Sequence, residues 1–238
     1  MATLTVMVWN IEWAEPESRR GRLIRAAIDA VAPDILCLPE APVGFMGDPD
    51  RTVASTPDHG YRSPPERRKV VLWSRRGWRD VDTIGDPHLP PGRFVAATTD
   101  TPVGPMPVVG VCIPWSHAHV TGGRRDRRPW DEHLAYLDGL ERHLRARTDL
   151  DWMLVLGDVN QRIPRTRQPE AVFDRLVAAV SDDLKMATAG PVLPLGLAMI
   201  DHVFAGRGLT VADVRAIDRV IDGIKVSDHH GVVVTLSC

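Results

Sequence analysis

The nonapeptide Trp152–Asn160, WMLVLGDVN, is the stretch of sequence that decides the fold. Its first five residues are apolar, as expected for a strand that is covered on both faces of a sheet. Gly157 then frees the backbone, and Asp158 and Asn160 follow two residues apart, so on an extended chain their side chains point the same way. The carboxyl end of such a strand is a frequent ligand site in α/β proteins. An ordinary Asp/Asn turn explains the tetrapeptide equally well, so the choice depends on the rest of the chain.

The composition predicts a folded protein without a strong overall charge. The chain has 238 residues, of which 44% are hydrophobic and 25% charged, and its net charge is −2. These values are ordinary for a globular protein and do not by themselves indicate a nucleic-acid binder. Basic residues are nevertheless concentrated between Arg62 and Arg79 and between Arg124 and Arg128. Each run is either a solvated surface or a contact region for a polyanion.

Cysteine usage and hydropathy bear on the expected location of the protein. Cys37, Cys112 and Cys238 are few and far apart, so no disulfide framework is predicted. The amino terminus lacks the pattern of a signal peptide, and no apolar run reaches the length of a membrane span. We therefore expect a soluble, cytoplasmic protein that does not bind membranes. The sequence indicates no protein partner.

Strand and helix patterns alternate along the whole chain. Apolar residues recur at helical spacing in 23–31, in 130–144 and in a third segment that begins near 169. The stretch 42–65 is rich in Pro, Gly and Asp, which predicts a long loop. This mixture favours a single layered α/β domain over residues 1–238. Strands are expected at 3–9, 35–38, 70–73, 93–97, within 105–113, and at 152–156, 201–204, 210–217 and 232–236.

Polar side chains follow or precede several of these strands. Strand ends of one sheet meet in space, so residues that are far apart in the chain can build one site. Together they offer carboxylates, amides and an imidazole, which suit Mg²⁺ or Mn²⁺ better than Zn²⁺. The inventory predicts metal-assisted hydrolysis of a phosphate ester, with Glu40 as a ligand and Asp228 as a second. The residues are Asn10, Glu40, Asp158, Asn160, Asp201, His202, Ser227, Asp228 and His229.

The segments 8–11, 33–40, 157–160, 200–203 and 227–229, in this order, resemble motifs of the endonuclease/exonuclease/phosphatase superfamily of DNase I-like enzymes. Each segment is short, but five in the family's order span nearly the whole chain. The resemblance implies a four-layer α/β sandwich, in which two packed mixed β-sheets are flanked by helices. It also implies a metal-dependent attack of water in line on a phosphate ester.

The resemblance further implies a role for each matched residue. Glu40 is similar to the family's metal-binding glutamate, and Asn10 to the amide that supports metal and phosphate; Asp228 would lie near the metal. The remaining residues would act on water and phosphate. Asp158 would position or deprotonate the attacking water, Asn160 would bond the phosphate, His229 would donate to a phosphoryl oxygen, and Asp201 would orient His229.

The sequence departs from the family in the strand before Asp158. Where members usually present a His or Tyr to the substrate, this chain has Cys112, which is not a strong hydrogen-bond donor. His117 or His119 would fill the vacated space, or both are ordinary loop residues. The roles of Trp115, His202 and His230 stay open, although His202 is expected to face away from the site. The departure leaves the substrate class undecided.

Three functions follow from these observations. The first is a phosphodiesterase, with nucleic acid as a candidate substrate and with Arg162 and Arg165 beside the cleft. The second is a phosphomonoesterase or small phosphodiesterase that acts on a sugar, lipid or nucleotide phosphate. The third is a binding module that kept the sandwich but lost turnover. The third is the least favoured, because every expected ligand and acid/base position is filled.

Overall fold

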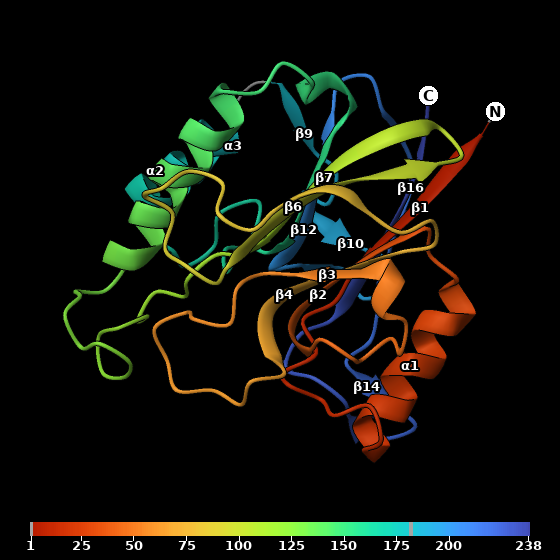
Figure 1. The fold of residues 1–238 in the computed structure, drawn as a ribbon, viewed down its shortest axis with the longest axis horizontal. Coiled ribbons are helices and arrows are strands. Elements are labelled where there is room, and N and C mark those ends of the chain that lie inside the picture. The colour runs from red at the N-terminus through yellow and green to blue at the C-terminus, as the bar shows by residue number, and fades with distance from the viewer. Residues whose placement is uncertain (1, 181–182) are drawn as a thin grey trace.

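Two six-stranded sheets pack face to face in the computed structural model, which describes residues 2–180 and 183–238 (Figure 1). The first sheet pairs β1 with β2 in parallel and with β16 antiparallel. Its strands are, in order, β13 (Thr210–Ile217), β16 (Gly231–Ser237), β1 (Thr3–Val8), β2 (Ile35–Pro42), β4 (Arg67–Ser74) and β3 (Thr52–Ala54).

The second sheet is also mixed, because β7 and β8 run parallel while its other pairs are antiparallel. Its strands are, in order, β5 (Arg79–Asp82), β6 (Phe94–Thr101), β7 (Gly104–Cys112), β8 (Leu154–Asp158), β12 (Asp201–Gly206) and β9 (Leu184–Met186). Two short hairpins complete the strands. They are β10 (Pro191–Val192) with β11 (Leu197–Ala198), and β14 (Val220–Ile221) with β15 (Ile224–Lys225).

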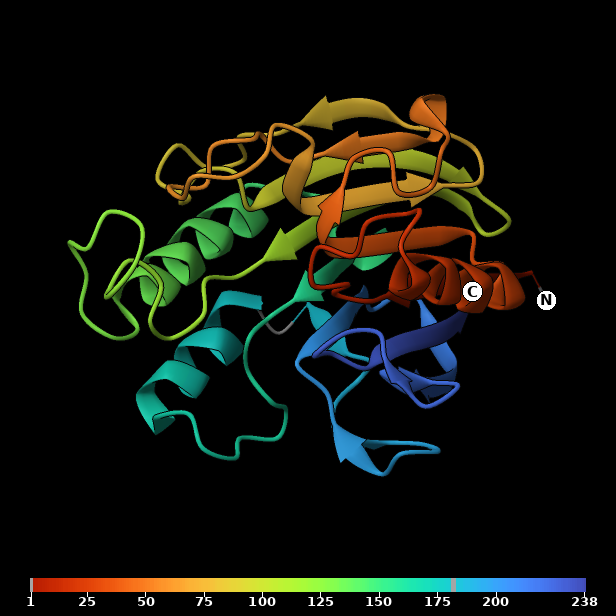
Figure 2. The same cartoon turned by 90° about the horizontal axis from the view of Figure 1, so that it is seen from below.

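Helices cover the outer face of each sheet (Figures 1 and 2). The helix α1 (Arg19–Val31) buries Ile24 and Ile28 against the first sheet. The helices α2 (Asp131–Arg145) and α3 (Glu170–Val180) pack on the second sheet with apolar side chains that include Tyr136. The result is a four-layer α/β sandwich, as the sequence predicted.

The strand β8 shows why its sequence is apolar at every position. Leu154 and Leu156 belong to the core between the two sheets, whereas Val155 packs under α2 and α3 on the opposite face. Successive side chains of a strand point to opposite faces, so a strand in the middle of four layers must be apolar on both. Burial of such side chains contributes roughly 1.5–3 kcal/mol each.

The structure differs from the sequence prediction in several details, of which three bear on the site. Trp152 lies in a 3₁₀ turn at Leu150–Trp152 and is 46% exposed, so β8 begins two residues later than expected. The predicted loop 42–65 contains a 3₁₀ turn at Pro49–Arg51 and the short edge strand β3. The strand β2 continues past Glu40. This residue adopts a φ of +52° and interrupts the pairing with β4, which resumes at Ala41.

None of the described helices combines the length and apolar character that crossing a membrane requires.

Candidate active site

Strand register places the acids of the second sheet next to one another. The strand β12 is antiparallel to β8, so its first residue, Asp201, lies opposite Asp158, the last residue of β8. On the other side of β8, Cys112 ends the parallel strand β7 opposite Asp158. The beginning of one strand and the ends of two others therefore meet at one edge of the sheet. The sequence segments that were read as separate strand ends come together here.

Asn10 connects this edge to the first sheet. Its side-chain Nδ2 donates to Asp158 Oδ2 at 3.0 Å, and its backbone N–H donates to Asp201 Oδ2 at 2.7 Å. The Ser227 hydroxyl in turn donates to the Asn10 carbonyl at 2.6 Å. All four residues are buried, so these hydrogen bonds hold the facing edges of the two sheets in a fixed relation.

Asp158 and Asn160 form a turn and a polar pair at once. The Asn160 backbone N–H donates to Asp158 Oδ1 at 2.9 Å, while its Nδ2 donates to Asp158 Oδ2 at 3.1 Å and to the Ile113 carbonyl at 2.9 Å. Asn160 reaches these partners because its φ is +55°, a left-handed conformation that Asn tolerates. The segment 157–160 is thus both an Asp/Asn turn and part of the polar edge where a ligand could bind. Gly157 is required, because a Cβ there would lie 1.9 Å from the Val111 carbonyl oxygen.

His229 and Asp201 form a hydrogen-bonded pair across the two sheets. His229 Nδ1 lies 2.9 Å from Asp201 Oδ1. Burial would lower the pKa of His229, but the charges of Asp201 and Asp158 and the hydrogen bond to Asp201 outweigh it and raise this pKa to about 10. The imidazole is therefore protonated at neutral pH and is a hydrogen-bond donor. Burial also raises the pKa of Asp158, against the effect of the charged His229.

Glu40 faces the same site from the first sheet, and Lys69 covers it. Lys69 Nζ lies 2.5 Å from Glu40 Oε1. In the sequence, Lys69 stands out only as part of a basic run, because the strand that became β4 was predicted to begin at Val70. Extending that strand by one residue and pairing it with β2 would have found the contact. A left-handed φ in Glu40, a non-glycine residue inside a strand, is a conformation that often occurs at functional sites.

The donor set at this edge fits a hard divalent cation. The Glu40 carboxylate is partly accessible, and the Asp228 carboxylate, which is half exposed, lies 3.8 Å from His229 Nε2. Ligand atoms of Asp158, Asp201 and His229 also lie within 4.8 Å of one another. His229 is protonated and bonded to Asp201, however, so the oxygen atoms are the better ligands. Mg²⁺ takes one or two carboxylates and keeps several waters, which suits this arrangement.

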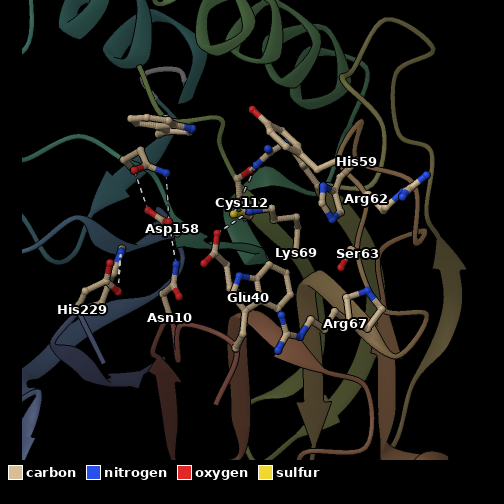
Figure 3. A pocket seen from close by; sticks show the side chains of 17 residues that line it. Asn10, Glu40, His59, Arg62, Ser63, Arg67, Lys69, Cys112, Asp158 and His229 are labelled. Carbon is tan, nitrogen blue, oxygen red and sulfur yellow. Dashed lines mark hydrogen bonds and ion pairs between the residues drawn. The ribbon is translucent and has the colours of Figure 1, made fainter. Parts of the chain in front are cut away.

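A cavity of about 470 Å³ opens in front of these residues. Figure 3 shows its two halves: Asn10, Asp158 and His229 lie on one side, and His59, Arg62 and Arg67 on the other. Glu40, Lys69 and Cys112 lie between them (Figure 3). Many lining residues come from loops and strand starts without a motif, and among them only Arg62, Arg67 and Lys69 were considered, as part of the basic run 62–79 with a polyanion as one possible contact. The lining residues without a motif are Trp13, His59, Tyr61, Arg62, Ser63, Pro64, Arg67, Lys69 and Arg93.

The residues expected to bind substrate are dispersed. Arg162 lines a neighbouring cavity of about 360 Å³, which shares Asp228 and His229 with the first. Arg165 lines neither cavity and donates to the Gln168 carbonyl at 3.4 Å. His117 is exposed, and its Nδ1 lies 2.9 Å from the Ser116 hydroxyl. Only Arg162 therefore lies beside the site.

His119, one of the two histidines considered for the space next to Cys112, is not among the residues that line the cavity. It is fully buried, and its ring stacks on Tyr61 with centroids 4.5 Å apart. The adjacent basic run is anchored too, because Arg124 and Arg127 both pair with Glu132, which is 3% exposed. These two arginines hold the loop to the start of α2. Their charges are offset by Glu132.

The two other histidines left open by the sequence differ in environment. His202 is buried on the far face of β12, where Nδ1 lies 2.8 Å from the Thr188 hydroxyl and Nε2 lies 3.0 Å from the Gln161 carbonyl. This confirms its structural role. His230 lies in the second cavity and accepts from the Arg219 N–H at 3.2 Å. Trp115 lines the first cavity and is half exposed.

Comparisons with known proteins agree with this fold. The sequence profile of the Endonuclease/Exonuclease/phosphatase family matches residues 7–229. Similar solved structures include an AP endonuclease from Archaeoglobus fulgidus (18% identity, 97% of this chain and 98% of that chain, TM-score 0.69). A 3′-5′ exonuclease from Neisseria meningitidis is another (19% identity, 97% and 98%, TM-score 0.68). A third is a 3′ phosphatase from Neisseria bound to a product DNA hairpin (17% identity, 97% and 98%, TM-score 0.67). No curated protein gives a significant match to the sequence.

Proposed function

Because the chain belongs to the endonuclease/exonuclease/phosphatase family, we propose that it hydrolyses phosphate esters with Mg²⁺ or Mn²⁺. The preferred substrate class is a phosphodiester, with nucleic acid as the candidate. The observation that carries this proposal is the hydrogen-bonded network of Asn10, Asp158, Asp201 and His229 at one end of the cavity. We assign the Asp158 carboxylate to orienting the attacking water and the protonated His229 imidazole to the phosphoryl group; both lie at this end of the cavity.

Asp158 is the residue that orients the attacking water. Both of its oxygens already accept N–H groups, from Asn10 and from Asn160, so the carboxylate is held in one orientation. Its raised pKa, caused by burial, makes it a better proton acceptor than an ordinary aspartate. Asn160 is held beside it by hydrogen bonds and lines the cavity.

His229 stabilises the charge that develops on the phosphoryl group. Asp201 accepts a hydrogen bond from the Nδ1–H group and fixes the ring, so Nε2–H is left for the substrate. A positive donor aimed at developing negative charge in a buried site is a large contribution to phosphoryl transfer. When bound, the metal neutralises charge on phosphate and lowers the pKa of water. Glu40 would hold it, with Asp228 and Asn10 as further ligands.

The alternative is a phosphomonoesterase or a small phosphodiesterase that acts on a sugar, lipid or nucleotide phosphate. It is supported by the small volume of the cavity. It is also supported by the ion pairs of Arg124 and Arg127 with Glu132, which leave these two arginines less available to a polyanion. Such a site would hold a compact ester as readily as a long strand.

A metal-dependent activity screen tests the proposal. Wild type and Asp158→Asn are assayed with Mg²⁺, with Mn²⁺ and with a chelator, on DNA, RNA, bis-p-nitrophenyl phosphate and p-nitrophenyl phosphate. Asp174→Asn is the matched control, because Asp174 is exposed on α3. We expect diester cleavage that the chelator and Asp158→Asn abolish. Release of inorganic phosphate from monoesters without diester cleavage would favour the alternative, and inactivity on every substrate would contradict both.

A further inference from the structure

Arg93 is a buried cation without a counter-charge. Arg93 lines the cavity, although the residue is only 2% exposed to solvent. Its Nη1 donates to the Cys112 carbonyl at 3.3 Å and lies 3.9 Å from Cys112 Sγ. Within the part of the chain that the structure describes, no carboxylate pairs with it. Burying a guanidinium without a counter-charge is energetically unfavourable, so this geometry indicates an anion from outside the chain.

His59 lies beside Arg93 and is equally short of partners. It is 4% exposed and lines the same cavity, and neither Nδ1 nor Nε2 has a hydrogen-bond partner among the described residues. The backbone of Gly92 packs against it, since a Cβ on Gly92 would lie 2.9 Å from His59 Cβ. Arg93 is the next residue, so the two side chains start from adjacent points.

The surroundings of His59 and Arg93 are electropositive. Burial and the charges of Lys69 and Arg93 together lower the pKa of His59 to about 4, against the opposing effect of Glu40. Lys69 and Arg67 are paired with Glu40 and Glu15. Arg62, at the exposed side of the cavity, has no acidic partner among the described residues. The cavity thus offers two unpaired guanidinium groups and an unpaired imidazole.

This half of the cavity is within reach of a substrate held by Asp158. Arg93 and Cys112 are hydrogen-bonded neighbours through the Cys112 N–H at 3.0 Å, and Cys112 lies opposite Asp158 on the adjacent strand. Two strand spacings separate the backbones of Arg93 and Asp158 by roughly 10 Å. The Arg93 side chain shortens this distance. A second anionic group on one compact ester can therefore reach Arg93 while the scissile phosphate is at Asp158.

We propose that Arg93 and His59, with Arg62 at the open side, form a second anion-binding subsite that holds a further phosphate group of the substrate. This phosphate is either the next phosphodiester of a strand or a terminal phosphate of a small ester. The subsite itself requires no metal and no turnover. Its role in substrate selection rests on the proposed phosphoesterase function.

The first test measures phosphate binding without metal. The unfolding temperature is recorded with a chelator in increasing inorganic phosphate, with chloride at equal ionic strength as reference. We expect phosphate to stabilise wild type in a saturable way, and Arg93→Met to lose this effect. His229→Gln retains it, because the anion is held at the other end of the cavity. Arg165→Met is the control, since Arg165 lies outside the cavity.

Folding of Arg93→Met is verified by circular dichroism. Arg93→Lys, which retains the charge, and Arg62→Gln, which changes an exposed side chain, serve as second variants. Weaker phosphate stabilisation in Arg62→Gln, with partial retention in Arg93→Lys, supports the subsite. Equal phosphate stabilisation of wild type and all these variants would overturn it.

The second test measures substrate selection. Hydrolysis of thymidine 5′-(p-nitrophenyl phosphate) is compared with that of the same ester carrying a 3′-phosphate, and with a trinucleotide. We expect the added phosphate to lower KM in wild type, and Arg93→Met to raise the KM of that substrate by about 10- to 100-fold. The rise in the KM of the substrate with two phosphates should exceed any change in the KM of the singly charged ester. If Arg93→Met raises the KM of the trinucleotide but not that of the ester with a 3′-phosphate, the anion is the next phosphodiester of a nucleic-acid strand.

The two proposals fail separately. If wild type hydrolyses none of the esters but phosphate still stabilises it through Arg93, the phosphoesterase function is wrong and the subsite stands. Suppose instead that the esters are hydrolysed, that the added phosphate does not lower KM, and that Arg93→Met changes the KM of both esters equally. The subsite proposal is then wrong.

Discussion

The Lys69 ammonium lies 2.5 Å from Glu40, so the carboxylate proposed to bind the metal is paired with a cation of the protein itself. Lys69 also lies 5.1 Å from the centre of the Trp13 ring, which gives the ammonium a second stabilising contact. A metal at Glu40 must therefore displace Lys69 or bind beside its charge. In either case the affinity for the metal is lower than an unpaired glutamate would provide.

Lys69→Gln is expected to bind Mn²⁺ about 10-fold more tightly than wild type, because a competing charge near the ligand is removed. The measurement is the shift of unfolding temperature with Mn²⁺ concentration. Lys225→Gln, an exposed lysine on β15, is the control and should leave the affinity unchanged. An unaltered affinity in Lys69→Gln would show that Glu40 does not hold the metal.

His229→Gln is expected to slow hydrolysis by roughly 10²–10⁴-fold, because the positive donor facing the phosphoryl group is lost. The comparison is made in kcat at saturating substrate, with circular dichroism to confirm the fold. A rate close to wild type would remove His229 from the mechanism.

Asp201→Asn is expected to move the alkaline limit of activity to lower pH. Burial lowers the pKa of His229, but Asp201 and Asp158 raise it to about 10, so wild type keeps a protonated His229 well above neutral pH. Without the Asp201 charge this pKa falls, and activity that needs the protonated form is lost as the pH rises past a lower value. The kcat profile between pH 6 and 10 measures the shift. Identical profiles would contradict the orienting role of Asp201.

Acid is expected to destabilise the protein through two buried histidines outside the cavity. Burial lowers the pKa of His133 and of His202 to about 4, whereas the unfolded chain binds protons near pH 6.5. The unfolded state thus gains protons first, so stability is full above pH 6.5 and falls as the pH drops toward 4. The loss is on the order of 3 kcal/mol for each histidine. Urea unfolding between pH 4 and 8 measures it, and His133→Gln should flatten the slope.

Gly157→Ala is expected to destabilise the fold by about 3 kcal/mol or more, because the new Cβ would overlap the Val111 carbonyl. Gly190→Ala is the matched control: its φ is also positive, at +92°, but nothing lies within 4 Å of the added Cβ. The control should lose only about 1–2 kcal/mol from backbone strain. Equal losses in the two variants would show that the contact with Val111 has no part in the effect.

Local patterns predicted a layered α/β domain and the residues of the acidic half of the cavity, and the family resemblance added the four-layer sandwich. An apolar strand followed by Asp158 and Asn160 is visible in nine residues. The basic half was missed for a physical reason. His59 lies in a loop, Arg93 at the start of a strand and Lys69 opposite Glu40, and only strand register brings them together. The sequence left the position of His119 open, because it does not reveal the stacking of this ring on Tyr61.

The hydrogen bonds of Asn10 have a consequence for how the protein responds to change in its core. Asp158, which we propose orients the attacking water, ends a strand of one sheet, whereas Glu40 and His229 lie on or beside strands of the other, and Asn10 bridges the two sheets. A small slippage of one sheet along the other would leave every strand intact, yet it would pull the acid and the imidazole out of register. The rate of hydrolysis should therefore depend on the alignment of the two sheets, and it should decline before the protein unfolds.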